Sequence, residues 1–243
     1  MTPERLFAAQ EATWPTFAVT QVGPFRIREG RGGGNRVSAA TAEGPVSEAD
    51  LAAAEAAIAA LGQVPLVMVR PGQDALDALL AAQGYALVDP VVMLAAPVAE
   101  LAAEPPAPVT AFTIWEPLAI MDELWEELGI GAGRRAVMAR VAGPKTAVLG
   151  RQNDRAAGAG FAAIHDGLCF VHAVAVAPDH RRQGAARNMM RAAAQWAQDE
   201  GAEQIVVLVT EANAAARALY ASLGMRNVGQ YHYRMKTTPR PQP

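Results

Sequence analysis

A weak internal repeat divides the chain into two halves that follow the same order of strands and helices. In the first half the apolar run PLVMV (65–69) is followed by a helical pattern that ends at Gly84. In the second half IVVLV (205–209) is followed by a helical pattern that ends at Gly224, 140 positions later than Gly84. Shared alanine-rich composition is the alternative explanation, but the matching order of strands favours a repeat. The chain is therefore predicted to contain two halves with one plan.

The segments before these runs extend the plan in both halves. Helical apolar spacing covers 47–62 and 187–201, and each stretch ends at a glycine. Upstream lie FAVTQVG, FRIREG and RVSAAT in the first half, and TAVLGRQ, GAGFAAIHDG and CFVHAVAVAP in the second, which predict antiparallel strands. The second half also opens with a predicted strand (109–115) and a helical region. We therefore predict an α/β (α+β) chain with a mixed, mostly antiparallel twisted sheet flanked by helices in each half.

A proline-rich break separates the two halves. Within APVAELAAEPPAPVT (96–110), three prolines crowd into four positions, a composition typical of a semi-rigid linker. The predicted limits are 1–98 for a first domain, 99–108 for the linker, 109–238 for a second domain and 239–243 for a tail.

Composition and charge narrow the possible partners. The formal net charge of −3 argues against a general nucleic-acid-binding protein, which usually carries a basic excess. Cys169 is the single cysteine, so it has no partner for an internal disulfide, and the sequence contains no metal-type Cys/His cluster. The first residues lack a signal-type apolar core, and no run approaches the roughly 18 apolar residues of a membrane span. We expect a cytoplasmic protein that binds no metal, membrane or nucleic acid.

The segment VAVAPDHRRQGAARNMM (174–190) has the properties of an anion site. A strand that ends near Val176 and a helix that begins near Gly184 would leave unpaired backbone N–H groups over 182–187, where the helix dipole is positive. Gly184 would let a ligand approach the backbone. A solvated arginine-rich turn is the alternative interpretation of this pattern alone. The side chains that would surround the anion are short, polar or cationic: Arg181, Arg182, Gln183, Ala185, Ala186 and Arg187.

This segment and the later VTEANAAARALYASLGM resemble the two characteristic segments of the GCN5-related N-acetyltransferase (GNAT) superfamily. The matching residues are Val176, Pro178, Arg181, Gly184, Ala186, Asn213, Ala216, Leu219, Tyr220, Leu223, Gly224 and Met225. The resemblance is clear over 145–236 and weaker over 109–144. It implies that main-chain amides of the first segment hold the pyrophosphate of acetyl-CoA. It also implies transfer of the acetyl group to a primary amine, by direct attack of the amine on the thioester.

The resemblance assigns further roles around the donor. Main-chain groups of Val174, Ala175 and Val176 would pair with the pantetheine arm, and one amide near Val174 would polarise the thioester carbonyl. Tyr220 would donate a proton to the CoA thiolate; an ordinary core aromatic is the alternative. Asn213 would either hydrogen-bond the CoA arm or cap its helix. Arg217 completes the residues assigned to cofactor binding.

A positioned base or a water chain is useful because freeing an amine of pKa about 10.4 from its proton at pH 7 costs roughly 4.6 kcal/mol. VHAVAVAPDHRRQG resembles a segment of the serotonin N-acetyltransferases in which a strand histidine serves in the proton relay, and His172 occupies that position. Strand alternation predicts that His172, Val174 and Val176 share one face. A hydrogen-bonded core histidine is the alternative. Glu211 is a second candidate base, unless it is a solvated loop acid, and unassisted water is a third possibility.

The first half departs from the motifs. Gly44 lies 140 positions before Gly184, but its neighbours TAEGPVSE contain no arginine, and Pro45 removes one amide donor. Leu80 stands in place of the tyrosine and Gln73 in place of the asparagine. We therefore predict a degenerate GNAT-like first half and one acetyl-CoA site per chain, in the second half.

Two other functions remain open at this point. One is a non-catalytic acyl-CoA sensor or interaction module, and the other is an acyltransferase with a different acyl donor. The amine acceptor is unidentified, although Trp125, Glu126 and Glu127 are candidates to attract it; a charged helix face is the alternative for these acids. The expected assembly is a monomer or a homodimer.

Overall fold

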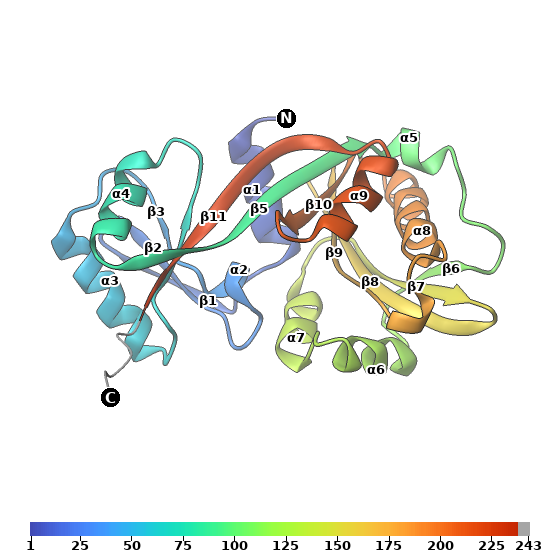
Figure 1. Ribbon diagram of the computed structural model, residues 1–243, viewed down its shortest axis with the longest axis horizontal. Coiled ribbons are helices and arrows are strands. Elements are labelled where there is room, and N and C mark those ends of the chain that lie inside the picture. Colours follow the sequence, from blue (N-terminus) through green and yellow to red (C-terminus); the bar gives the residue numbers. More distant parts are fainter. Residues whose placement is uncertain (238–243) are drawn as a thin grey trace. The chain divides into compact units, whose positions relative to one another are not determined.

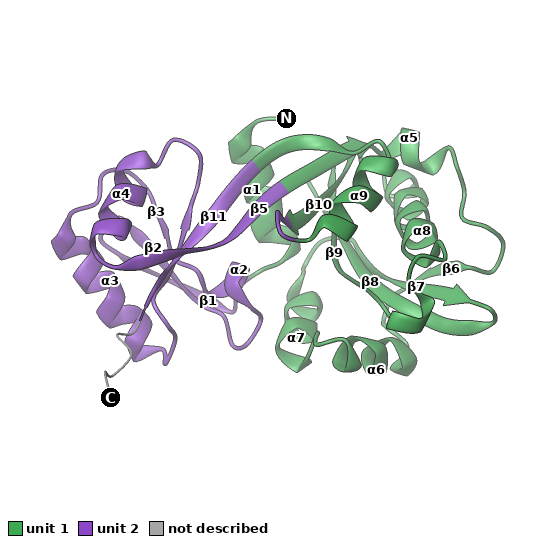
Figure 2. Cartoon of the chain, viewed as in Figure 1, with its two compact units in different colours: residues 1–15, 93–209, 213–229 green, residues 16–92, 210–212, 230–243 purple. Residues whose placement is uncertain are grey.

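The computed structural model describes residues 1–237, so the predicted tail at 239–243 lies outside the described residues. The chain forms two compact units (Figure 2). Unit 1 comprises 1–15, 93–209 and 213–229, and unit 2 comprises 16–92, 210–212 and the residues from 230 onward. Each unit therefore draws on both halves of the sequence. The domain limits predicted above, at 98 and 109, stay a prediction about sequence segments.

Unit 1 is built on a mixed sheet (Figure 1). Its strands follow the order β5-β10-β9-β8-β7-β6, and the β9–β10 pair is parallel whereas β6–β7, β7–β8 and β8–β9 are antiparallel. These strands are β5 (Tyr85–Pro97, its later residues), β6 (Ala111–Ile114), β7 (Lys145–Gln152), β8 (Arg155–His165), β9 (Leu168–Val176) and β10 (Gln204–Thr210). The helices are α1 (Pro3–Thr13), α5 (Val98–Ala102), α6 (Ala119–Glu127), α7 (Ala132–Arg140), α8 (Ala185–Asp199) and α9 (Ala214–Ser222), with the 3-10 turn η1 (Pro178–His180).

Helix α8 packs against a glycine-lined face of this sheet. A Cβ added to Gly150 would lie 2.5 Å from the sulfur of Met189, and one added to Gly160 would lie 3.2 Å from its terminal methyl group. The glycines on β7 and β8 thus make room for the methionine of α8, which is 2% exposed. This close approach fixes the helix over β7 and β8.

Unit 2 has the same kinds of elements around its own core. An antiparallel sheet contains β1 (Ala18–Val22), β2 (Phe25–Glu29) and β3 (Thr41–Ala42), and β4 (Leu66–Val69) pairs antiparallel with the end of β11 (Arg226–Lys236). A parallel bridge joins Ala40 to Val67. The helices are α2 (Asn35–Ser38), α3 (Glu48–Ala60) and α4 (Asp74–Ala82). The core cluster includes Phe25, Ile27, Ile58 and Leu80.

The structure confirms the predicted fold class: each half supplies strands of a mixed, mostly antiparallel sheet flanked by helices. The spacing of 140 residues also relates two helices, because adding 140 to the residue numbers of α4 gives the residue numbers of α9. The last strand of each half departs from a simple repeat. Met93–Pro97 of β5 belongs to unit 1, and the end of β11 pairs with β4 in unit 2.

One strand prediction needs correction, and the predicted linker contains part of a helix. RVSAAT (36–41) is not a strand throughout, because Asn35–Ser38 forms α2 and only Thr41 belongs to β3. The preceding Gly32 and Gly34 have φ of 76° and 93°, which bends the chain into that turn. The predicted linker 99–108 begins inside α5, whose Leu101 is buried and which packs against α8. In both places a short apolar run was compatible with more than one element.

Among the described residues, no helix has both the length and the apolar character that a membrane span requires.

Candidate functional site

The parallel strands β9 and β10 diverge within unit 1. Their ladder begins at Leu168 opposite Gln204 and ends at Val171 opposite Val207, although β9 continues to Val176. Beyond that point the described pairing of β9 is with β8 alone. The edge of β9 that faces β10 therefore presents backbone groups to which an extended ligand can hydrogen-bond as a strand would.

A β-bulge lies at the start of the divergent part of β9. His172 pairs with Phe161 and Ala175 pairs with Ala159, so Gly160 alone lies opposite Ala173 and Val174. Ala173 has a φ of 51°, in the left-handed region. The indole N–H of Trp125 donates a hydrogen bond of 3.0 Å to the carbonyl oxygen of Ala173. The bulge re-aims the backbone at this point, as bulges next to active sites commonly do.

The bulge overturns one prediction about side-chain faces. An extra residue in a strand reverses the alternation beyond it. His172 consequently lies on the face of Phe161 and Ala175, whereas a Cβ on Gly160 would lie 3.5 Å from a methyl group of Val174. The expectation that His172, Val174 and Val176 share one face is wrong. Val174 and Val176 lie on the face covered by α8, and His172 lies on the other.

The loop that follows β9 leads directly into α8. The turn η1 is followed by Arg182 at φ 59° and by Gly184 at φ 90°, which is the N-cap of α8. The first backbone bond of the helix runs from the Asn188 amide to the Gly184 carbonyl oxygen, at 3.0 Å. The backbone amides that precede Asn188 in the first turn of α8 have no acceptor within the helix. Gly184, as the N-cap, has no side chain that could accept from them. A Cβ on Gly184 would meet no heavy atom within 4 Å, so open space lies in front of this turn.

Side chains of the loop hold its backbone in place. Arg181 Nε donates to the carbonyl oxygen of Val176 at 3.0 Å, and Gln183 Nε2 donates to the carbonyl oxygen of Asp179 at 2.9 Å. Arg187, in the first turn of α8, donates to Ser222 Oγ of α9 at 3.0 Å. These bonds tie the strand end, the loop and both helices together. They give Arg181, Gln183 and Arg187 a structural role, while their predicted contacts with a cofactor stay predictions.

Helix α9 carries the residues of the second motif. Asn213 Oδ1 accepts a hydrogen bond of 3.1 Å from the Ala216 amide, so the capping alternative describes Asn213. Tyr220 is 7% exposed, and burial raises its pKa to about 12. Its phenol therefore keeps its proton at neutral pH. Arg217 is exposed on the same helix.

His172 lies in an aromatic environment formed with the first helix of the chain. Its ring centroid is 4.9 Å from that of Trp14 and 5.8 Å from that of Phe170, and the residue is 4% exposed. Its Nε2 lies 3.1 Å from Thr13 Oγ1, which itself donates to the Ala9 carbonyl oxygen at 2.7 Å. Since the hydroxyl has one proton, it accepts from His172, which therefore carries its proton on Nε2. This contact assigns Nδ1 as the basic nitrogen of the neutral ring.

The contact between α1 and His172 predicts a stability effect. Replacing Thr13 with valine leaves the Nε2–H of His172 without its acceptor, so the free energy of unfolding should fall by about 1–3 kcal/mol. Urea unfolding measures the change, with Thr113→Val on the exposed strand β6 as the matched control. Equal stability of both variants would show that the Thr13 contact contributes nothing.

No sequence pattern indicated that Thr13, Trp14 or Trp125 belong to this site. Thr13 and Trp14 are distant in sequence from β9, and Trp125 was instead a candidate for amine attraction. That interpretation of Trp125 is wrong, because its side chain is 0% exposed and holds the bulge. Glu126 pairs with Arg135 at 2.5 Å, which fits the alternative of a charged helix face.

Glu211, the second candidate base, belongs to unit 2. Its amide donates to the Pro90 carbonyl oxygen at 2.8 Å, and its residue lines a pocket in that unit together with His232 and Asp77. The structure therefore groups Glu211 with other residues of unit 2, whereas His172 and Tyr220 belong to unit 1.

In unit 2 the helix start that corresponds to the loop before α8 is occupied by a capping box. Ser47 Oγ accepts from the Asp50 amide at 3.2 Å, and Asp50 Oδ2 accepts from the Ser47 amide at 2.9 Å. Glu48 and Asp50 add negative charge to the first turn of α3. This helix start therefore already has its acceptors and repels a further anion.

The capping box predicts a second stability effect. Ser47→Ala removes the acceptor of the Asp50 amide and should lower the free energy of unfolding by about 1 kcal/mol. Urea unfolding measures the difference, and Ser47→Asp, which keeps a capping acceptor, serves as the control. Unchanged stability of the alanine variant would contradict the role of Ser47.

Among the described residues, no group of three or more His, Cys, Asp or Glu side chains is placed to hold a metal ion.

Comparison with known proteins connects this geometry to a family. Residues 113–225 match the model of the acetyltransferase (GNAT) family. The chain is 34% identical over 77 residues to the uncharacterized N-acetyltransferase YobR of Bacillus subtilis (strain 168), a match that covers 32% of this chain. The matched stretch spans 31% of the length of each of two curated relatives.

Solved structures share the fold over nearly the whole chain. A GCN5-related N-acetyltransferase from Kribbella flavida superposes with a TM-score of 0.70 at 21% identity, covering 96% of this chain and 95% of that one. A tandem GNAT protein from the clavulanic acid biosynthesis pathway superposes with a TM-score of 0.60 at 14% identity, covering 84% and 76%. The fold is thus that of GNAT proteins.

Proposed function

We propose that the protein is an acetyl-CoA-dependent N-acetyltransferase that moves an acetyl group to a primary amine by direct attack of the amine on the thioester. The observation that carries the proposal is the first turn of α8, which opens from Gly184 at φ 90° directly behind the divergent end of β9. We further propose that the chain contains two GNAT-like halves, of which one binds acetyl-CoA, and that this donor site lies in unit 1.

The loop before α8 suits the diphosphate of the donor. Backbone N–H groups at a helix start bind phosphate oxygens well, because they carry the positive end of the helix dipole. The proposed binding residues are those of the loop and first turn, Arg181, Arg182, Gln183, Gly184, Ala185, Ala186 and Arg187. The open space at Gly184 supports this assignment. In unit 2, the capping box at Ser47 and Asp50 supports the proposal of a single acetyl-CoA site per chain.

The free edge of β9 suits the extended arm of the donor. Main-chain groups of Val174, Ala175 and Val176 are proposed to hydrogen-bond the pantetheine amides. The bulge turns the backbone at Ala173, so an amide next to it can serve as a donor to the thioester oxygen. Asn213 Oδ1 caps α9, so Asn213 is proposed to contact the arm through its Nδ2. Arg217 remains a proposed contact of the cofactor.

Tyr220 is proposed to donate to the sulfur that leaves. Its pKa of about 12 keeps the phenol protonated. That value also limits full proton transfer, since a thiolate of pKa about 8.5 takes the proton at a cost of about 5 kcal/mol. The hydrogen bond to the developing thiolate is therefore the main contribution of Tyr220 to the transition state.

His172 is proposed as the base or as part of the proton relay. Its contact with Thr13 leaves Nδ1 as the basic nitrogen, and an imidazole suits proton transfer near neutral pH. Its 4% exposure favours a relay through an intervening water over direct contact with the amine. Glu211 stays the alternative base. The cytoplasmic location and the monomeric or dimeric state also stay predictions.

An amine panel tests the proposed function. Peptides, polyamines and aminoglycosides would be incubated with acetyl-CoA, and free CoA would be measured with a thiol reagent. Release of CoA that depends on one class of amine is the expected result. Binding of acetyl-CoA without turnover on any amine would contradict catalysis and favour an acyl-CoA sensor.

A further inference from the structure

A pocket of about 250 Å³ lies in unit 2, where β4 ends and α4 begins. Its volume is slightly below the range of sites for drug-sized ligands, so it suits a small molecule. The apolar part of the wall includes Val69, Leu87 and Val91. The charged or titratable residues of the wall all belong to unit 2: Arg70, Asp74, Asp77, Glu211, Tyr231 and His232.

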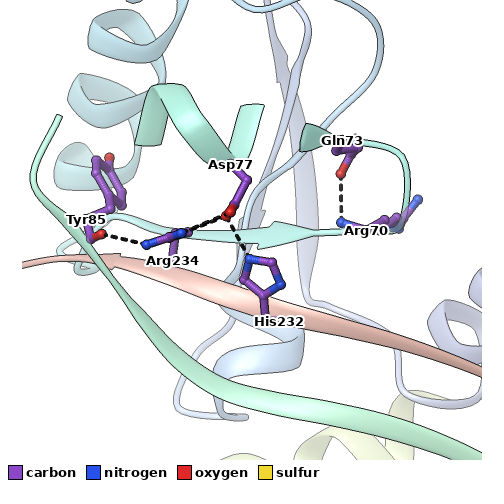
Figure 3. A network of polar contacts seen from close by, with 6 residues as sticks. All are labelled: Arg70, Gln73, Asp77, Tyr85, His232 and Arg234. Atoms are coloured by element: carbon purple, nitrogen blue, oxygen red, sulfur yellow. Dashed lines mark hydrogen bonds and ion pairs between the residues drawn. The ribbon is translucent and has the colours of Figure 1, made fainter. Parts of the chain in front are cut away.

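A polar network fixes one wall of this pocket (Figure 3). Asp77 accepts two hydrogen bonds from Arg234, from Nε at 2.7 Å and from Nη2 at 2.9 Å. His232 Nε2 lies 2.7 Å from Asp77 Oδ1. Arg234 also donates to the Tyr85 carbonyl oxygen at 3.3 Å, which ties β11 to the start of β5. Three contacts on one carboxylate hold the His232 ring in a defined orientation.

The network determines which nitrogen of His232 is the acceptor. The guanidinium of Arg234 lowers the pKa of Asp77 to about 2, so the carboxylate is ionised at neutral pH and only accepts. His232 Nε2 therefore donates, and Nδ1 carries the lone pair of the neutral ring. In Figure 3 the second ring nitrogen of His232 points away from Asp77.

The charge of the wall selects for a cation. Three carboxylates line the pocket with one guanidinium, and Arg234 balances the carboxylate of Asp77. With the charge of Asp77 balanced by Arg234, the remaining lining charges, two carboxylates and one guanidinium, sum to one negative charge. A primary ammonium group has three N–H donors and a positive charge, which matches a pocket wall that carries an acceptor nitrogen and carboxylates. An anion would meet a net repulsive wall, and a larger cation would exceed the volume.

We infer that this pocket binds a small molecule with a primary ammonium group, whose N–H donors are accepted by Nδ1 of His232 and by the carboxylate of Asp74. This inference concerns binding to unit 2 and does not depend on acetyl transfer. Glu211 adds negative charge to the same wall, and the apolar residues contact the carbon chain of the ligand.

Equilibrium binding to the full chain without acetyl-CoA tests the inference. The probe is n-butylammonium, observed by two-dimensional NMR through the amide shifts of residues around the pocket. The comparison probes are n-butanol, which lacks the charge, and tetramethylammonium, which lacks N–H donors. Saturable shifts with n-butylammonium and at least tenfold weaker binding of both comparison probes are expected. Equal affinity for tetramethylammonium, or no saturable shifts, would overturn the inference.

Two variants locate the contacts. His232→Leu removes the acceptor Nδ1, and Asp74→Asn removes one exposed carboxylate; each should weaken n-butylammonium binding at least fivefold. Glu48→Gln is the matched control, because Glu48 begins α3 as Asp74 begins α4 and is also exposed. Asp74→Asn tests the inference even if the histidine variant folds poorly. A loss of affinity in Glu48→Gln equal to that in Asp74→Asn would show a nonspecific charge effect and overturn the assignment.

Discussion

Replacing Tyr220 with phenylalanine is expected to lower turnover about 100-fold while the affinity for acetyl-CoA stays the same. The phenol is 7% exposed and keeps its proton, because burial raises its pKa to about 12. Phenylalanine fills the same space but gives no hydrogen bond to the sulfur that leaves. The loss therefore appears in the transition state and not in the binding of the donor.

Steady-state release of CoA and calorimetric titration with acetyl-CoA check this expectation together. Tyr233→Phe is the matched control, since Tyr233 is 3% exposed, lies in unit 2 and donates to the Tyr231 hydroxyl. It should keep its turnover. Full activity of Tyr220→Phe would remove the tyrosine from the chemistry and leave it the role of a core aromatic.

Replacing Gly184 with valine should weaken acetyl-CoA binding at least about 100-fold, which corresponds to about 2.7 kcal/mol. Gly184 has a φ of 90°, which a β-branched residue strongly disfavours. The backbone would turn away from this conformation, and two or three charge-assisted hydrogen bonds to a diphosphate would be lost. The added side chain would also fill the open space in front of the helix start.

Gly201→Val provides the matched control for this second prediction. Gly201 follows the other end of the same helix, has a φ of 78°, and an added Cβ there meets no heavy atom within 4 Å. Both variants should lose similar stability, but only the Gly184 variant should lose binding, as measured by calorimetry. Equal affinity of the two variants would reject the diphosphate assignment.

The sequence predicted the loop and helix start because their signals are local. A glycine at a strand-to-helix junction, followed by two alanines, indicates both the backbone conformation and the space around it. The repeat was also readable, since α4 and α9 coincide at a spacing of 140 residues. Local chemistry and periodicity thus identify elements reliably when a glycine marks the turn.

The sequence could not predict features that depend on distant partners. Ala173 is an ordinary strand residue, and only the pairing with β8 shows that it forms a bulge. Thr13 contacts His172 across 159 positions of sequence. The final strand β11 pairs with β4 of unit 2, although it follows α9 in the chain. A strand pattern predicts that a segment pairs with another strand, but it does not indicate which strand is the partner.

Backbone amides at the start of α8 are proposed to hold the diphosphate of acetyl-CoA. Amide chemical shifts of the ¹⁵N-labelled chain, titrated with coenzyme A and in parallel with pantetheine, test this claim most directly. Coenzyme A should shift the amides of residues 182–187 strongly, whereas pantetheine, which lacks the diphosphate, should leave them unchanged and shift only those of β9. Unchanged amides over 182–187 at saturating coenzyme A would contradict the account.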